Sequence, residues 1–446
     1  MEPNFILQTD SYKVSHKDQY PAGTTHVYSY FESRGGMFDE VVFFGLQCLL
    51  RKHLAGVRVT ADTVLEAQKL LNDHLSPGAM NVDGWDHVVS QHGGKLPLSI
   101  HAVPEGTRVP TSTPMITVVN TCARCFWLTN YVETTLVRVW YPTTVATLSR
   151  EIKEVILAYL VRTGDPKLID FKLHDFGYRG TSSEESAGIG GMAHLINFMG
   201  TDTIIALRYA MEYYDAPEMP AFSIPAAEHS TITSWGRDGE IDAYRNMLNL
   251  YGGKVPLFAV VSDSWDIYDA CERLWGGLLK DEVVALDGKS TLIIRPDSGD
   301  PPGVVTRVLD ILGRRFGHTV NASGFKVLPS YIRIIQGDGI NYDSIGKILS
   351  AMERARWSAD NIAFGMGGGL LQQVNRDTEE FAFKCSSITV LGEERDVWKE
   401  PVTMSSKNSK RGRFDPDEYG MVEVFRDGEI LRTWRFDEVR ERANSS

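Results

Sequence analysis

The stretch SIPAAEHSTITSWG, residues 223–236, holds one histidine, His229, among small residues and beside Glu228. Small neighbours leave room around an imidazole, and neutral imidazole is a competent base, metal ligand or phosphoryl acceptor near pH 7. The alternative is a buried histidine that only packs in the core. Glu228 or an acid elsewhere in the chain would orient the ring. The histidine alone does not choose among these roles.

Several short apolar runs in the second half of the chain end in polar residues. PLFAVVSDS leads to Asp263, TLIIRPDSGDP leads to Arg295 and Asp297, and IRIIQGDG leads to Gly337 and Asp338. Carboxylates at such positions suit magnesium and ribose hydroxyls. An aspartate after a strand often only caps the next helix. Repetition at successive run ends favours a binding site.

Adjacent glycines, among them Gly367 and Gly368, end the stretch NIAFGMGGGL. Their backbone N–H groups could approach a phosphate at the start of a helix. No Lys-Ser or Lys-Thr follows, so the stretch is no P-loop, and it does not match the dinucleotide-binding fingerprint. A simple turn is the alternative, but QGDG one unit earlier favours a phosphomonoester pocket.

Basic residues gather late in the chain. They form either a solvated charged face or a clamp for a polyphosphate, in which arginine gives bidentate contacts and lysine a point charge. The residues are Arg376, Lys384, Lys399, Lys407, Lys410, Arg411 and Arg413.

The five cysteines are an odd number spread thinly, which fits a reducing compartment better than a disulfide framework. The stretch CARC at 122–125 has the C-x-x-C spacing. Because no second cysteine pair or nearby histidine accompanies it in the sequence, we favour a structural role over a zinc or redox site.

Bulk composition limits the class of protein. A chain of 446 residues with 43% hydrophobic and 23% charged residues can bury a large core. We find neither an apolar run that could span a membrane nor an export signal, so we expect a cytoplasmic protein with no membrane partner. The net charge of −12 disfavours nucleic acid as a partner.

The elements that must position these residues form an α/β pattern from residue 168 onward. The run ends at 263, 297, 338 and 367 are 34, 41 and 29 residues apart, which is the spacing of βα units. Polar residues at successive strand ends are how α/β barrels build their sites. We therefore predict an α/β barrel over 168–385, with the site on its rim.

The remaining segments predict a second, mixed α+β domain built from both ends of the chain. The N-terminal region, 1–167, mixes strands and helices, and 41–56 has helical periodicity. The C-terminal region, 386–446, contains a basic loop at 405–414 and a predicted hairpin at 421–436. We expect it to pack with the N-terminal region.

A series of motifs, in this order, resembles the nicotinamide phosphoribosyltransferase family: TDSYKVSHKDQYP, YSYFESRG, LHDFGYRG, GTDT, SIPAAEHSTITSWG, VVSDSWDIY, LIIRPDSGDP, IQGDG, GGGLLQ and FKCS. The resemblance runs from about residue 5 to the C-terminal hairpin. It implies the fold of type II phosphoribosyltransferases, an irregular α/β barrel with a second mixed domain. The short loops after FESRGG and KRGRF suggest a bacterial or phage member.

The resemblance also implies a reaction: nicotinamide and 5-phosphoribosyl 1-pyrophosphate give nicotinamide mononucleotide and pyrophosphate, in NAD salvage. Family members are head-to-tail homodimers with sites at the subunit interface. Phe176 resembles the family's ring-stacking aromatic residue, and Tyr12 of the second subunit the other face of the sandwich. Asp202 resembles the acceptor of the carboxamide N–H, which would repel the carboxylate of nicotinate.

Other matched positions imply further contacts. Arg295 would hold the amide side of the ring or adjoining substrate groups, and Asp263 and Asp297 would face ribose, pyrophosphate and Mg²⁺. The 5′-phosphate and ribose would be wrapped by Gly337, Asp338, Gly367 and Gly368. Pyrophosphate and ATP would be bound by Arg34, Arg179, Arg376, Lys384 and Lys399.

His229 matches the histidine that ATP phosphorylates in this family, with phosphohistidine hydrolysis coupled to turnover. Two rival functions stand beside this one. A nicotinate phosphoribosyltransferase would carry a neutral or cationic group in place of Asp202. A catalytically silent nucleotide-binding homologue would have lost part of the ring sandwich, the rim aspartates or the histidine.

Overall fold

The computed structural model describes residues 4–403 and 408–445, so Lys407 and the start of the predicted basic loop lie outside the described residues. The chain forms two compact units. Unit 1 comprises Met1–Thr147, Tyr209–Pro217 and Val374–Ser446, and unit 2 comprises Leu148–Arg208 and Glu218–Gln373.

These units differ from the predicted regions at both boundaries. Helix α6, Trp140–Thr163, enters unit 2 at Leu148, ahead of the predicted boundary at 167. Strand β14, Phe381–Val390, belongs to unit 1 although its first half falls within the predicted barrel region. The reason is non-local pairing, since β14 runs antiparallel to β1, Thr24–Ser33, along its length.

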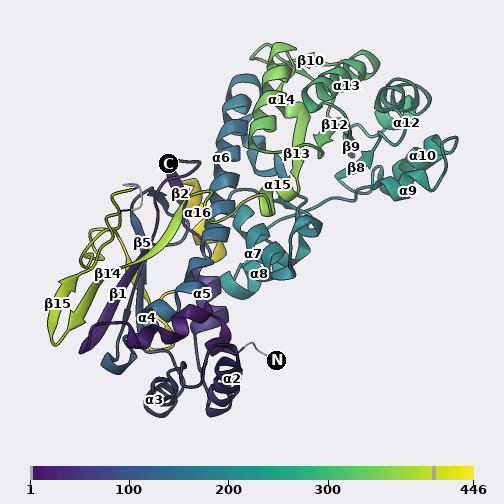
Figure 1. Ribbon diagram of the computed structural model, residues 1–446. Helices are drawn as coiled ribbons and strands as arrows, with labels where there is room; N and C mark the ends of the chain where they lie inside the picture. The colour runs from purple at the N-terminus through teal and green to yellow at the C-terminus, as the bar shows by residue number, and fades with distance from the viewer. Residues whose placement is uncertain (1–3, 404–407, 446) are drawn as a thin grey trace. The chain divides into compact units, whose positions relative to one another are not determined.

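Unit 2 is built on a six-stranded sheet in the order β7-β6-β13-β12-β9-β8. Every neighbouring pair is parallel. Its strands are β6 Leu173–Asp175, β7 Gly200–Thr201, β8 Leu257–Val261, β9 Thr291–Arg295, β12 Ile332–Gln336 and β13 Ile362–Met366. Four of them, β8, β9, β12 and β13, are labelled in Figure 1, where they lie side by side.

One irregular segment joins the two edges of this sheet. Phe222 pairs with Gly200 on β7, and Ala226 pairs with Ala259 on β8, both in parallel. The backbone N–H of Ala227 donates to the carbonyl of Ala259 at 2.9 Å. The predicted irregular α/β barrel is therefore confirmed, with the segment 222–227 in place of regular closing strands.

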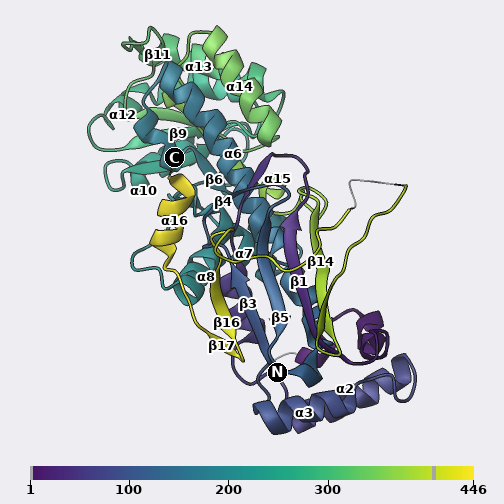
Figure 2. The same ribbon diagram turned by 90° about the vertical axis from the view of Figure 1, so that its left-hand side faces the viewer.

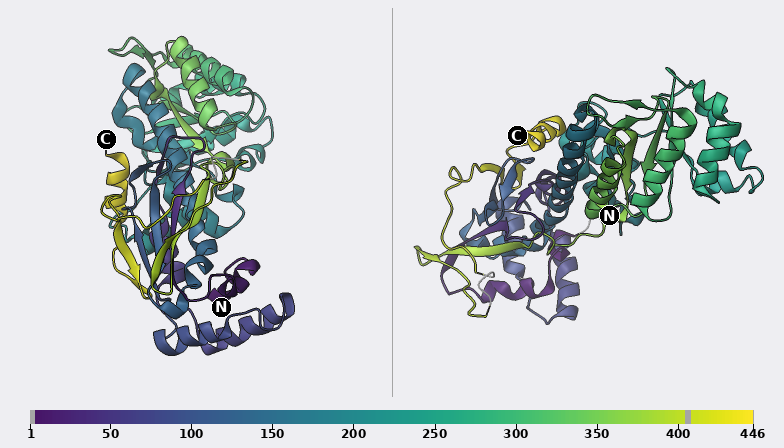
Figure 3. Two further views of the ribbon diagram at one scale, coloured as in Figure 1. Left: turned by 60° about the vertical axis from the view of Figure 1, so that its left-hand side comes forward. Right: turned by 90° about the horizontal axis from the view of Figure 1, so that it is seen from above.

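Helices cover the outside of this sheet, as Figures 1 and 3 show for the teal and green part of the chain. Helix α13 starts at two prolines after Asp300, whose side chain accepts from the Gly303 N–H at 3.2 Å. Its apolar residues recur at helical spacing and are buried. Helix α8, Ile204–Tyr214, passes into unit 1 at Tyr209. The helices that lie within unit 2 include α7 Glu184–His194, α9 His229–Thr233, α10 Glu240–Tyr251, α12 Lys280–Val284, α13 Pro301–Phe316, α14 Tyr342–Arg354 and α15 Gly368–Leu371.

Strand β9 shows how the sheet separates its two faces. Leu292 and Ile294 are fully buried under the helices. Thr291, Ile293 and Arg295 alternate with them and line a cavity inside the barrel. The same alternation turns the side chains of Lys172, His174 and Phe176, along β6, into that cavity.

Unit 1 contains a seven-stranded sheet in the order β15-β14-β1-β5-β3-β16-β17. All its pairings are antiparallel. The other strands of this unit are β2 Glu40–Val42, β3 Leu98–Ala102, β4 Arg108–Pro110, β5 Pro114–Asn120, β15 Glu393–Asp396, β16 Val422–Arg426 and β17 Glu429–Ile430. The predicted hairpin at 421–436 is confirmed by the pairing of β16 with β17.

Helices of unit 1 lie around this sheet, and Figure 2 shows α2 and α3 side by side near its end. They are α1 Leu46–Leu49, α2 Ala61–His74, α3 Val82–His92, α4 Leu128–Tyr131, α5 Glu133–Val137 and α16 Phe436–Asn444. The helix predicted over 41–56 is wrong in its first part, because residues 40–42 pair with β4 and Gly45 has φ +102°. Across residues 4–403 and 408–445, no helix has both the length and the apolar character that crossing a membrane requires.

Candidate active site

The two predicted rim aspartates meet at the carboxyl ends of β8 and β9. The backbone N–H of Asp297 donates to Asp263 Oδ2 at 3.1 Å, and the Ser298 hydroxyl donates to the same oxygen at 2.6 Å. Because β8 and β9 are neighbours in a parallel sheet, their carboxyl ends lie at the same edge. The sequence pattern thus placed both carboxylates correctly at one rim.

His229 approaches this pair of aspartates from α9. Its Nε2 lies 3.0 Å from Asp263 Oδ1, and its Nδ1 lies 4.0 Å from Asp297 Oδ2. The side chain of Asp263 is 4% exposed, whereas that of His229 is 48% exposed. The Glu228 carboxylate accepts instead from the Ser230 hydroxyl. Asp263 is therefore the acid that orients the imidazole.

Arg295 links the aspartate pair to the predicted ring site. Its guanidinium donates to Asp297 Oδ1 at 2.8 and 3.2 Å. The same group lies over the Phe176 ring, 5.6 Å from its centroid. A Cβ at position 337 would lie 3.3 Å from this guanidinium. Gly337 therefore leaves room for the Arg295 side chain.

The Phe176 ring packs against the backbone of Gly365 on β13. A Cβ at position 365 would lie 1.9 Å from the ring, which only glycine avoids. The Phe176 N–H donates to the Met366 carbonyl at 2.9 Å and so fixes the residue at the end of β6. Phe176 lines the barrel cavity, so the ring presents a surface for stacking a flat molecule.

Asp202 follows β7 and also lines the cavity. The Ser223 hydroxyl donates to Asp202 Oδ1. The backbone N–H of Asp202 donates to the Asp175 carbonyl at 2.9 Å. One carboxylate oxygen is thus occupied by a donor from the segment that closes the barrel. The arrangement places a negative group at the same cavity as Phe176 and Arg295.

Asp175 supports these residues and was not among the predicted site residues. Its Oδ1 accepts from the Gly177 N–H at 2.7 Å, and its Oδ2 from the Thr201 hydroxyl at 3.4 Å. Burial raises the pKa of this carboxyl to about 6, against hydrogen bonds from Thr203, Gly177 and Thr201 that lower it. The sequence signal was the stretch LHDF, which places this acid between His174 and Phe176, two residues that line the cavity.

The glycine-rich segment lies at the end of β13, at the rim. Gly180 and Gly368 approach closely, since a Cβ at 180 would come 3.4 Å from the Gly368 Cα. A Cβ at Gly368 would meet nothing within 4 Å, which leaves its backbone accessible. Asp338 and Arg179 are both exposed. The first N–H groups of α15 are without partners inside that helix, as at every helix start.

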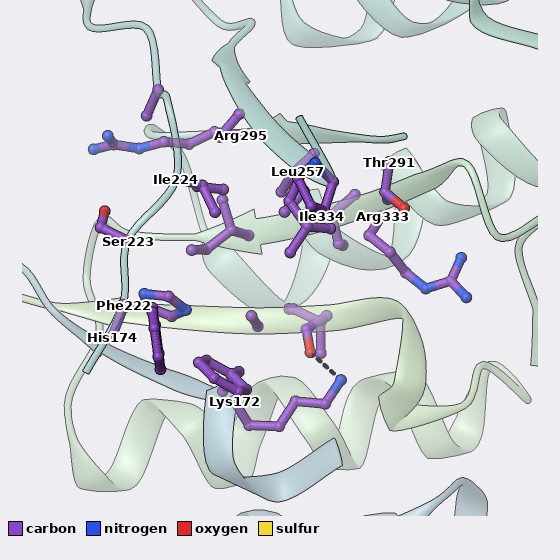
Figure 4. A pocket seen from close by; sticks show the side chains of 18 of the residues that line it. Lys172, His174, Phe222, Ser223, Ile224, Leu257, Thr291, Arg295, Arg333 and Ile334 are labelled. Carbon is purple, nitrogen blue, oxygen red and sulfur yellow. Dashed lines mark hydrogen bonds between the residues drawn. The ribbon is translucent and has the colours of Figure 1, made fainter. Parts of the chain in front are cut away.

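The cavity inside the barrel has a volume of about 660 Å³. Figure 4 shows His174, Ser223 and Arg295 toward one end and Lys172 and Arg333 toward the other. Burial lowers the pKa of Lys172 to about 7, while its ammonium donates to three carbonyls, those of Ala359, Asp360 and Ile362. The cavity therefore extends from the rim through the barrel interior.

Four predicted phosphate-binding cations form a cluster in unit 1. Burial lowers the pKa of Lys384, and repulsion by Arg34, Lys399 and Arg376 lowers it further, against an opposing effect of Glu133. Arg34, Lys399 and Arg376 therefore lie near enough to Lys384 for their charges to act on it. Tyr12, also in unit 1, is 61% exposed, with its ring edge-on to His16 at 5.0 Å.

The rim carboxylates can accept a divalent cation at one position. Both oxygens of Asp263 are already hydrogen-bonded, to His229, Asp297 and Ser298. Asp297 Oδ2 has no closer partner in the described part of the chain than His229 Nδ1 at 4.0 Å. One or two carboxylates with substrate phosphates and water are the ligands that magnesium usually takes. The donor set fits Mg²⁺ bound together with a phosphorylated substrate.

Comparison with known structures shows the same fold elsewhere. Nicotinate-nucleotide pyrophosphorylase from Pyrococcus furiosus superposes with a TM-score of 0.58 at 14% identity, over 99% of this chain and 95% of that one. Human nicotinic acid phosphoribosyltransferase gives the same TM-score and identity, over 98% of this chain and 93% of that one. At this identity the likeness concerns the fold alone.

Sequence comparisons give the family. Residues 171–429 match the nicotinate phosphoribosyltransferase (NAPRTase) family, and residues 4–100 match the nicotinamide phosphoribosyltransferase N-terminal domain. The nicotinamide phosphoribosyltransferase of Xanthomonas campestris is 47% identical over 99% of this chain and 98% of its own. The nicotinamide phosphoribosyltransferase of Acinetobacter baylyi is 32% identical over 98% of this chain and 97% of its own. The chain is a pentosyltransferase that belongs to the nicotinamide phosphoribosyltransferase family.

Proposed function

We propose that this enzyme joins nicotinamide to 5-phosphoribosyl 1-pyrophosphate, giving nicotinamide mononucleotide and pyrophosphate for NAD salvage. The relatives' names support the substrate class. The observation that carries the proposal is the carboxylate of Asp202 at the same cavity as the Phe176 ring. A carboxylate accepts the N–H of a carboxamide and repels the carboxylate of nicotinate.

Nicotinamide binds flat against Phe176 in this proposal. The Phe176 ring rests against the backbone of Gly365 on its other side. Arg295 lies beside the Phe176 ring and contacts the amide oxygen of nicotinamide or a neighbouring substrate group. Tyr12 of a second subunit covers the other face. The site holds the pyridine nitrogen in line with the ribose C1, so that the attack becomes an effectively unimolecular step.

The transferase step forms the bond between the pyridine nitrogen and the ribose C1 and breaks the bond between C1 and pyrophosphate. Positive charge develops on the ribose and negative charge on the departing pyrophosphate, so stabilising these charges lowers the barrier. Asp263 and Asp297 face the ribose, and Asp297 supplies the free carboxylate oxygen for Mg²⁺. Bound Mg²⁺ would neutralise pyrophosphate charge. Gly337, Asp338, Gly367 and Gly368 hold the 5′-phosphate and ribose.

ATP hydrolysis is coupled to turnover through His229 in this proposal. With Nε2–H donated to Asp263, the lone pair is on Nδ1. Nδ1 attacks the γ-phosphorus of ATP, the bond to the β-phosphate oxygen breaks, and ADP leaves. Water later hydrolyses the phosphohistidine to inorganic phosphate and free imidazole. Arg34, Arg179, Arg376, Lys384 and Lys399 bind the phosphates.

The proposed assembly is a homodimer with both sites at the subunit interface, acting in the cytoplasm. All five cysteines are free thiols, which supports a reducing compartment. Mixing Tyr12→Ala with Phe176→Ala chains tests the shared site, because a mixed dimer regains one intact site of two. Random exchange restores about a quarter of the wild-type activity. No recovery, with exchange proven by mass labels, contradicts a shared site.

Product analysis tests the reaction itself. Nicotinamide and 5-phosphoribosyl 1-pyrophosphate with Mg²⁺ are incubated with and without ATP, and nicotinamide mononucleotide is measured by chromatography. The expected result is product formation that ATP increases and that Phe176→Ala largely removes. Binding of nicotinamide mononucleotide without any turnover would instead identify a silent homologue.

A further inference from the structure

Four side chains with metal-binding atoms meet in unit 1, on elements that the proposed reaction does not use. His87 and His92 come from α3, and Cys122 and Cys125 from the turn after β5. One ligand atom from each residue lies within 4.8 Å of the other three. The shortest recorded contact joins His87 Nε2 to Cys122 Sγ at 3.4 Å.

These distances are close to those of a tetrahedral zinc site. With Zn–S about 2.3 Å and Zn–N about 2.0 Å, the nitrogen-to-sulfur edge of the tetrahedron is roughly 3.5 Å. The contact between His87 and Cys122 already has this length. The longest separation, at most 4.8 Å, requires a closure of about 1 Å, which side-chain rotation can supply.

The scaffold beneath the cluster holds the two segments together. Trp85 on α3 packs edge-on against Trp127 at 4.7 Å and Tyr131 at 5.1 Å. The Asn120 amide donates to the Cys122 carbonyl at 2.8 Å, and the Cys125 N–H to the same carbonyl at 2.9 Å. Packing and hydrogen bonds therefore fix the backbone on both sides of the four ligands. Pre-positioned ligands of this kind are typical of built metal sites.

The chemistry of the four residues also fits a metal ion. Both cysteines are free thiols, and Cys125 is buried. His92 Nε2 is buried and has no hydrogen-bond partner within the described ranges. A buried polar atom without a partner is unfavourable, and coordination would satisfy an imidazole nitrogen. Two thiolates neutralise a divalent cation, and a set of two sulfur and two nitrogen ligands is typical of zinc.

We propose that His87, His92, Cys122 and Cys125 bind one zinc ion that fastens α3 to the turn at Ala123–Cys125. The sequence disfavoured zinc at CARC because no histidine accompanies that stretch in the sequence. Folding brings two histidines to it from an earlier helix. A site with four protein ligands leaves no open position for a substrate, so this zinc is structural.

Metal analysis of the full-length chain, purified without an affinity tag and without chelator, tests the proposal. The wild type should contain about one zinc per chain. Cys122→Ser with Cys125→Ser should contain less than about a tenth of that, since thiolates supply half of the ligands. Cys385→Ser, a change of the same kind outside the cluster, should keep the full content. Equal zinc in the double variant and the wild type would overturn the proposal.

Cobalt substitution tests the same site without any variant. Wild type stripped of metal and titrated with Co²⁺ should show the strong visible bands of tetrahedral cobalt together with a thiolate charge-transfer band. Chelation of the zinc should also lower the melting temperature. The weak spectrum of octahedral cobalt, or a Cys122–Cys125 disulfide with no metal in freshly purified protein, would contradict a zinc site.

Discussion

His229 Nε2 lies 3.0 Å from Asp263 Oδ1, and that aspartate is anchored in turn by Asp297 N–H and the Ser298 hydroxyl. This contact selects the tautomer with the proton on Nε2, because a carboxylate accepts and does not donate. In the proposed phosphorylation, Nδ1 is then the nucleophilic nitrogen. The adjacent acid, Glu228, accepts from Ser230 instead.

The Asp263→Asn change tests this orientation. An amide no longer selects one tautomer, so phosphohistidine formation from γ-labelled ATP should be roughly 10–100-fold slower. Glu228→Gln is the matched control and should label at the wild-type rate. His229→Ala should give no acid-labile label, and label that persists there would contradict the role of His229.

In the proposed function, Asp202 determines the preference for nicotinamide over nicotinate. In Asp202→Asn the repulsion of a carboxylate disappears and the charge-assisted acceptor is lost. The kcat/KM for nicotinamide should fall roughly 5–150-fold, which corresponds to a loss of about 1–3 kcal/mol of transition-state stabilisation, while the kcat/KM for nicotinate rises. Ser223→Ala removes only the hydroxyl donor to Asp202 and should keep the preference. An unchanged ratio of the two substrates in Asp202→Asn would exclude this role.

Gly365 controls the position of the Phe176 ring, on which nicotinamide stacks in the proposed function. Alanine there places a Cβ 1.9 Å from Phe176, so the ring must move away from the strand. The expected result is a KM for nicotinamide at least roughly 10-fold higher, with a stability cost of about 1–3 kcal/mol.

Gly346→Ala in the middle of α14 is the control for the alanine change itself. A Cβ at that position meets nothing within 4 Å, so stability should rise by about 0.5–1 kcal/mol with kinetics unchanged. Wild-type KM in Gly365→Ala would show that Phe176 does not stack the substrate.

Asp175 gives unit 2 a pH dependence. Burial raises its pKa from 3.8 to about 6, so the folded state holds a proton that the unfolded state has released. Its stabilising contribution is complete below pH 3.8 and is lost as the pH rises through about 6. Relative to Asp175→Asn, the wild type should lose about 3 kcal/mol of unfolding free energy across this window. Urea unfolding at several pH values measures the difference, and parallel curves would contradict it.

Features that depend on local sequence were predictable. Asp263 and Asp297 follow apolar strands directly, and neighbouring parallel strands must end at one rim. Motif order also gave the family, which the relatives confirm. Residues 41–44 were assigned to a helix because a short apolar run fits strand and helix equally well.

Features that depend on distant pairings were not predictable. The fit of Phe176 against Gly365 requires β6 beside β13, which no spacing reveals. The orienting acid of His229 lies 34 positions away, and the histidines beside CARC lie on an earlier helix. The segment 222–227 closes the barrel through isolated pairings without a strand pattern of its own.

Competition between nicotinamide and nicotinate tests the central claim most directly. Both substrates, at equal concentration and with distinct isotopes, share a limiting amount of 5-phosphoribosyl 1-pyrophosphate in the presence of Mg²⁺ and ATP. The ratio of the two mononucleotides equals the ratio of the kcat/KM values. The account predicts at least roughly 100-fold more nicotinamide mononucleotide, because a charge-assisted amide contact and a repelled carboxylate act together. An excess of nicotinate mononucleotide would contradict it.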